Sequence, residues 1–123
     1  LVHAMAHSLG GLCDLAHGDC NALLLEKVVA FNYAEAGSKY DQLAPCLELA
    51  LENCSEAERA ALIVERISTL RQDLGITQRL RSMGVGADDI RRLAGFANQD
   101  PCVATNPRGV DPEMIAAIYQ AIY

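Results

Sequence analysis

All three histidines of this chain, His3, His7 and His17, fall near its start. His3 and His7 are one helical turn apart, so on a helix both imidazoles project from the same face. We expect Gly10-Gly11 to end that helix, and the turn before Gly18 can then fold His17 back toward His3. Imidazole is the commonest side-chain ligand of divalent transition metals, so converging rings predict a metal site. From spacing alone, the simpler interpretation is a pair of solvated or core-packed histidines.

The residues around the histidines extend this pattern. Residues 3–11 read HAMAHSLGG, residues 17–25 read HGDCNALLL and residues 28–32 read VVAFN. Together they resemble the metal-binding signature of the iron-containing alcohol dehydrogenases. Residues 100–108 read DPCVATNPR, which resembles that family's closing motif, and a helix-like segment follows as it does in the family. The two motifs stand in the family's order at about its separation, so the resemblance covers the whole chain.

This resemblance implies roles for four side chains. His3 and His17 match the metal ligands, with iron(II) usual in the family and zinc possible. His7 matches a histidine close to the metal and the nicotinamide, where it would contact the cofactor and relay a proton. A polar helix face is the alternative for His7. Cys102 matches a segment near the substrate pocket, and a buried structural thiol is its alternative.

The resemblance also implies an activity and a larger protein. The family's enzymes interconvert small alcohols and aldehydes by hydride transfer to and from NAD(P). In them a nucleotide-binding domain precedes the histidine motif, holds most of the NAD(P), and supplies an aspartate and another histidine to the metal. We therefore expect residues 1–123 to be one helical domain, the C-terminal part of a longer enzyme, and inactive alone. Glu26-Lys27 and Ala16 depart from the family's usual Pro-His and Pro, which leaves the substrate open.

Composition and charge exclude several other classes. The chain has 51% apolar residues, 5% aromatic residues and a net charge of -6, so most of its surface would repel DNA. The five cysteines are an odd number with no C-x-x-C pair, which favours reduced thiols in the cytoplasm. No apolar run approaches the roughly 20 residues of a membrane span. The missing domain would leave an apolar face exposed. Such a face would favour self-association of the chain as a homo-oligomer.

Capping patterns predict the helices that must position the site. Ser55 and Glu58 form a capping box before an apolar stripe that ends at Leu74. Asp111 and Pro112 supply a cap and a proline at the first helical position. Further helices are expected over 1–9, 18–31 and 87–98, with a break at 32–37 and a second capping box from Ser38. With no convincing strand, we predict an all-α fold, a compact helical array like the C-terminal domain of the dehydroquinate synthase-like, iron alcohol dehydrogenase fold.

Two other functions remain open at the level of sequence. Residues 77–96 could form a DNA-binding helix-turn-helix, although Asp88 and Asp89 would then face phosphates. The chain could also be a non-catalytic helical regulatory or interaction module derived from the dehydrogenase family. In that case, adding the missing half would restore neither metal binding nor activity.

Overall fold

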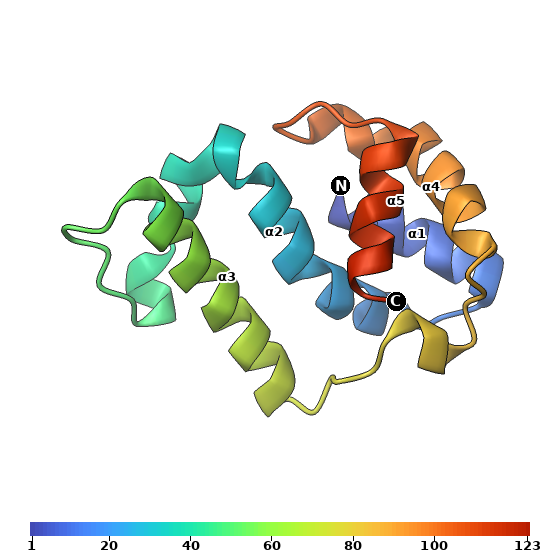
Figure 1. Ribbon diagram of the computed structural model, residues 1–123, viewed down its shortest axis with the longest axis horizontal. Coiled ribbons are helices and arrows are strands. Elements are labelled where there is room, and N and C mark those ends of the chain that lie inside the picture. Colours follow the sequence, from blue (N-terminus) through green and yellow to red (C-terminus); the bar gives the residue numbers. More distant parts are fainter.

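The computed structural model describes residues 1–123 as an all-α fold, which confirms the predicted fold class (Figure 1). No strand is present. None of the helices combines the length and the apolar character needed to cross a lipid bilayer. The helices are α1 (Val2–Cys13), α2 (His17–Asp41), α3 (Glu56–Asp73), α4 (Asp89–Gln99) and α5 (Pro112–Ala121), with 3-10 turns η1 (Ala44–Leu47), η2 (Leu80–Met83) and η3 (Pro101–Thr105).

The main core lies where both ends of the chain meet. Helices α1, α4 and α5 pack together with the first half of α2, while α3 lies on α2 at the other end of the molecule (Figure 1). The largest side chains that this core buries completely include Met5, Leu9, Leu24, Leu93 and Tyr119. Removing this much apolar surface from water is the main force that holds α1, and therefore the histidines, in place.

Two predicted helix starts are confirmed by their caps. The Ser55 hydroxyl accepts a hydrogen bond from the Glu58 N–H, and the Glu58 carboxylate accepts one from the Ser55 N–H at 2.7 Å. The Asp111 carboxylate accepts from the Met114 N–H at 2.8 Å, with Pro112 at the first helical position. Each cap satisfies backbone donors that would otherwise lack partners.

The predicted end of the first helix was wrong. Helix α1 runs through Gly10 and Gly11 to Cys13, and Asp14 ends it in the left-handed conformation with φ 53°. A helical glycine costs only about 1 kcal/mol relative to alanine, and burial of Leu9 and its neighbours on α1 exceeds this cost. The reversal that returns the chain toward the first helix therefore occurs at Asp14 and not at the glycines.

The predicted break at 32–37 is present only as a kink at Ala36. Helix α2 continues to Asp41, with a single non-helical residue, Ala36 (φ -131°, ψ 16°), so Ser38 lies inside the helix instead of capping a new one. Asn32 does not break the helix because its side chain pairs with Asn106 from a distant loop. Local sequence signals cannot anticipate a tertiary partner of this kind.

The predicted inward stripe of α3 is only partly buried. Ile63 is completely buried, but Leu70 and Leu74 are 46% and 68% exposed. Helix α3 packs mainly on α2 and η1, and its last turn contacts α2 through Arg71 and leaves Leu70 and Leu74 exposed. The first element of the candidate helix-turn-helix is the 3-10 turn η2 instead of an α-helix, which removes the geometry that DNA recognition by that motif needs.

Candidate metal centre

The three histidines meet on one exposed surface at the junction of α1 and α2. His3 and His7 are one turn apart on α1, and the left-handed turn at Asp14 brings His17, the first residue of α2, back to them. The ring centroids of His3 and His17 are 5.3 Å apart, those of His7 and His17 are also 5.3 Å apart, and those of His3 and His7 are 6.0 Å apart. The predicted convergence of the rings is therefore present.

The separation of His3 and His17 fits two ligands of one ion. A metal–imidazole bond of about 2.1 Å places the ring centre about 3.2 Å from the metal, so two tetrahedral ligands have centroids about 5.2 Å apart. The His3–His17 distance of 5.3 Å agrees with this value. Two neutral imidazoles suit iron(II) and zinc alike, and they leave room for carboxylate ligands.

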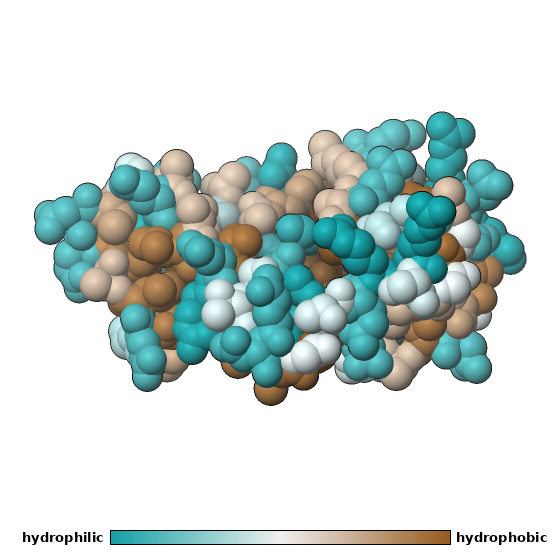
Figure 2. Space-filling view, turned by 60° about the horizontal axis from the view of Figure 1, so that its bottom comes forward, coloured by the Kyte–Doolittle hydropathy of each residue, from teal (hydrophilic) through white to brown (hydrophobic).

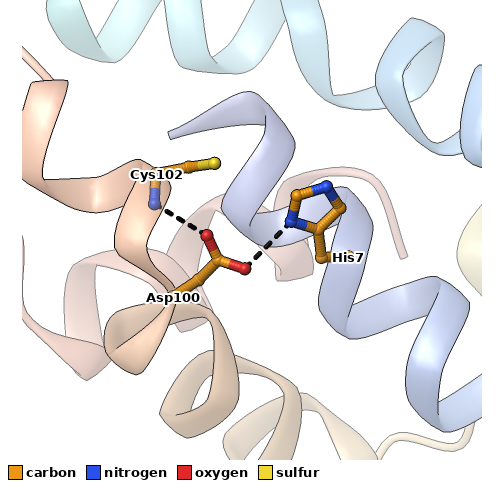
Figure 3. Close-up of side chains that lie close together, drawn as sticks. All are labelled: His7, Asp100 and Cys102. Carbon is orange, nitrogen blue, oxygen red and sulfur yellow. Dashed lines mark hydrogen bonds and ion pairs between the residues drawn. The ribbon is translucent and has the colours of Figure 1, made fainter.

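His7 lies at the same 5.3 Å from the His17 ring, but unlike His3 it is held by a carboxylate. Its Nδ1 lies 2.9 Å from Oδ2 of Asp100, while Nε2 points away from that carboxylate (Figure 3). The other oxygen of Asp100 accepts a hydrogen bond from the Cys102 N–H at 2.8 Å. This backbone bond and then the bond from His7 lower the pKa of Asp100 below its ordinary value. A carboxylate on Nδ1 fixes the ring's orientation and favours the tautomer with its proton on Nδ1.

Cys102 lies at the start of η3 between His7 and an open cavity. The cavity has a volume of about 470 Å³, and its lining includes Cys102, His3, Val28 and Thr105. The thiol is half-buried, so it is accessible from this cavity instead of being sealed in the core. A hydrogen bond to the neighbouring Asp100 raises its pKa.

The loop that carries Cys102 is tied to α2 by two further residues of the closing motif. The amides of Asn32 and Asn106 donate to each other's oxygens at 2.7 and 2.9 Å. Arg108 donates to the Phe31 carbonyl at 2.8 Å, and its guanidinium lies 4.2 Å above the Phe31 ring centre. These contacts hold the end of η3 and the loop after it against α2.

Helix α5 fixes the histidine-bearing turn from the other side. The hydroxyl of Tyr119 donates to the Met5 carbonyl at 2.7 Å, between the two histidines of α1. The hydroxyl is buried, and this burial raises its pKa well above the ordinary value. The Tyr119–Met5 contact joins residues that are 114 positions apart.

Sequence reasoning missed the positioning residues of the site. Asp100, Asn32 and Arg108 all lie inside the motifs that carry the family resemblance, but no local spacing links them to their partners. Asp100 is 93 positions from His7, and Asn32 is 74 positions from Asn106. The only sequence signal was a charged or amide side chain inside each motif, and for Asp100 the local cap on the Cys102 N–H already offered an explanation.

Comparison with known proteins agrees with this geometry. Residues 1–123 match the family described as Fe-containing alcohol dehydrogenase family, C-terminal. The chain is 37% identical over 123 residues to lactaldehyde reductase of Escherichia coli K12, and 36% identical over 122 residues to 1,3-propanediol dehydrogenase of Klebsiella pneumoniae. The alignments cover 100% and 99% of this chain but 32% of each relative. The chain thus spans about a third of the length of the curated relatives it matches.

Solved structures give the same result. A 1,3-propanediol oxidoreductase matches with a TM-score of 0.94 and 36% identity, covering 99% of this chain and 32% of the other. The alcohol dehydrogenase from Oenococcus oeni matches with a TM-score of 0.92 and 33% identity over the same shares. Because the family match spans every residue and the helices superpose at high similarity, this chain belongs to the Fe-containing alcohol dehydrogenase family, as its C-terminal helical domain.

Proposed function

We propose that this chain is the metal-binding domain of an iron-dependent, NAD(P)-linked alcohol dehydrogenase. The observation that carries the proposal is the 5.3 Å separation of the His3 and His17 rings, which suits two ligands of one ion. The family match over residues 1–123 supports iron as that ion, with zinc as the alternative. The five free cysteines suit a cytoplasmic protein.

Each side chain of the site has a distinct part in this proposal. The divalent cation, when bound, lowers the pKa of an alcohol hydroxyl and polarises an aldehyde carbonyl. His3 and His17 bind the cation. His7 contacts the nicotinamide and relays the hydroxyl proton, and Asp100 orients its ring through the 2.9 Å hydrogen bond. Cys102 lines the substrate side of the centre.

Other parts of the site come from outside these residues. All three imidazoles are exposed in this chain, so the ion would keep open positions on that side. We propose that a nucleotide-binding domain supplies an aspartate, a further histidine and most of the NAD(P) contacts. Relatives of about three times this length leave room for such a domain, since the chain covers 32% of them.

We propose a short alcohol or aldehyde as the substrate. The names of three relatives specify lactaldehyde, 1,3-propanediol and methanol, each of which has few carbons. The cavity of about 470 Å³ beside His3 and Cys102 has room for molecules of this size. Its partly apolar lining, with Val28 and Leu25, suits the alkyl part of such a substrate.

Metal analysis of the complete natural protein, with a panel of short alcohols beside it, tests this proposal. One iron or zinc per chain and NAD(P)-dependent oxidation are expected. The His17→Ala variant should lose the metal and the activity, whereas the exposed Cys46→Ser control should keep both. Turnover of an alcohol by residues 1–123 alone would contradict the proposal. A natural protein with neither metal nor turnover would favour the non-catalytic helical module instead.

A further inference from the structure

We propose that His7, Asp100 and Cys102 form a second cation site, distinct from the His3–His17 pair, that binds a thiophilic divalent cation such as zinc. One ligand atom from each of the three residues lies within 4.8 Å of the other two. Figure 3 shows the His7 ring and the Cys102 sulfur on the same side of the Asp100 carboxylate. The three side chains come from α1 and from the loop that begins η3, so the fold brings them together across the chain.

The donor set is one that tetrahedral zinc accepts. Zinc binds imidazole nitrogen, carboxylate oxygen and thiolate sulfur at about 2.0 to 2.3 Å, so its ligand atoms lie about 3.3 to 3.7 Å apart. The Nδ1–Oδ2 distance of 2.9 Å and the 4.8 Å limit for the whole group bracket these values. Small side-chain rotations suffice to close the site, with a water molecule as the fourth ligand.

Charge and position both suit a divalent cation. Binding releases the Cys102 thiol proton to solvent, after which one thiolate and one carboxylate balance the two positive charges. The His7 proton moves from Nδ1 to Nε2, so the ring stays neutral. The Cys102 N–H already holds the Asp100 carboxylate in place, and the Asn32–Asn106 pair holds the loop. The site is therefore largely organised before a cation arrives.

Occupation of this site would withdraw His7 from proton transfer, a consequence that rests on the proposed function. The cation would occupy Nδ1, take over Asp100 and place a positive charge beside the His3–His17 centre. We therefore infer that excess zinc inhibits the enzyme without displacing the metal bound by His3 and His17. Cation binding itself does not depend on the dehydrogenase activity.

A cadmium titration of the complete natural protein tests the site, because cadmium binds thiolates as zinc does and gives an ultraviolet thiolate-to-metal absorption. The absorption should saturate at one cadmium per chain. Cys102→Ser should abolish it, whereas the Cys46→Ser control should leave it unchanged. Asp100→Asn should weaken binding about tenfold or more but keep the absorption. His17→Ala should also keep it, which separates this site from the proposed catalytic centre.

Two results would overturn the inference. One is a thiolate absorption that persists in Cys102→Ser, and the other is its loss in His17→Ala, which would assign the sulfur to the His3–His17 centre. Alkylation provides a second measurement on the unsubstituted protein. One equivalent of zinc should slow alkylation of Cys102 but not of Cys46, and equal rates for the two thiols would also refute the site.

Discussion

The Asp100 carboxylate fixes the orientation of the His7 imidazole. The Asp100→Asn substitution removes the negative charge of that carboxylate. The amide has nearly the same shape, so the loop should stay in place. We expect kcat for alcohol oxidation to fall about tenfold to a hundredfold, with KM and bound metal little changed. Steady-state kinetics with metal analysis measures this split. Asp73→Asn, an exposed carboxylate on α3, is the matched control, and an unchanged kcat in Asp100→Asn would contradict the role.

The Tyr119 hydroxyl allows a second test at this scale. Tyr119→Phe removes its hydrogen bond to the Met5 carbonyl and leaves the ring in the core. We expect the free energy of unfolding to fall by about 1 kcal/mol, as measured by urea denaturation. Metal content should not change, because the Met5 carbonyl still lies within the helix; loss of metal would show that the hydroxyl is needed to hold the histidines.

The sequence is most informative about single residues when partners are close along the chain. The convergence of His3, His7 and His17 follows from helical periodicity and one short turn, and the rings do meet. Asp100 could not be paired with His7 in this way, because only the fold brings residues 93 positions apart together. The positions with family roles were identified from motifs, and their supporting contacts required the structure.

At the scale of elements, Glu26 joins α2 to α3. Its buried carboxylate lies 3.4 Å from Arg71 Nε and 3.0 Å from Lys27 Nζ. Burial alone would raise the pKa of Glu26, but a hydrogen bond from Ser68 and the charges of Lys27 and Arg71 lower it below its ordinary value. Ion pairing therefore stabilises the packing of α3 on α2 at neutral pH.

The pKa of Glu26 sets the direction of a pH effect. Because the folded-state pKa is lowered, the stabilisation is fully present above the ordinary value of 4.5 and is lost as pH falls through the folded-state pKa. Glu26→Gln should lower the free energy of unfolding by about 2 kcal/mol at pH 7. It should also make the free energy of unfolding depend less on pH below 4.5, the ordinary pKa of Glu26. Urea denaturation at several pH values measures both effects, with the exposed Glu52→Gln as control. Equal acid sensitivity of the variant and the unsubstituted protein would refute this role.

Helix boundaries were predictable where local chemistry decides them and not elsewhere. The Ser55 and Asp111 caps satisfy backbone donors within their own first turn, and both helices begin as predicted. Gly10-Gly11 and Asn32 carry local signals against helix that tertiary packing outweighs. Burial of the faces of α1 and α2 stabilises these segments by more than the glycines and the asparagine cost.

At the scale of the whole molecule, the core is divided unequally. Seventeen buried residues form the main core, whereas Val29, Tyr33 and Ile63 form a small second cluster between α2 and α3. Figure 2 shows hydrophobic atoms exposed at the end of the molecule that carries α3. Helix α3 is therefore supported by fewer buried side chains than α1 or α5, and it should open more easily.

Ile63→Ala tests this division. The substitution leaves a cavity in the small cluster, so the free energy of unfolding should fall by about 3 kcal/mol, and Ile63→Val should cost about 1 kcal/mol. Native-state hydrogen exchange should show faster exchange of α3 amides, with little change in α1 and α5. Equal acceleration in all helices would show that the domain opens as a single unit.

Two hydrogen bonds hold α1 against the C-terminal part of the chain, one to α5 and one to Asp100 before η3. They also constrain when the histidine site can form during synthesis. Met5 bonds to Tyr119 and His7 bonds to Asp100, so until nearly all of these residues have left the ribosome the histidine-bearing helix can pack only on α2. Contacts of such long sequence separation slow folding. If the proposed metal centre forms, a nascent chain should therefore bind the ion late, after α5 has emerged. A chain truncated before that helix should keep the imidazoles near each other in sequence but bind the ion poorly.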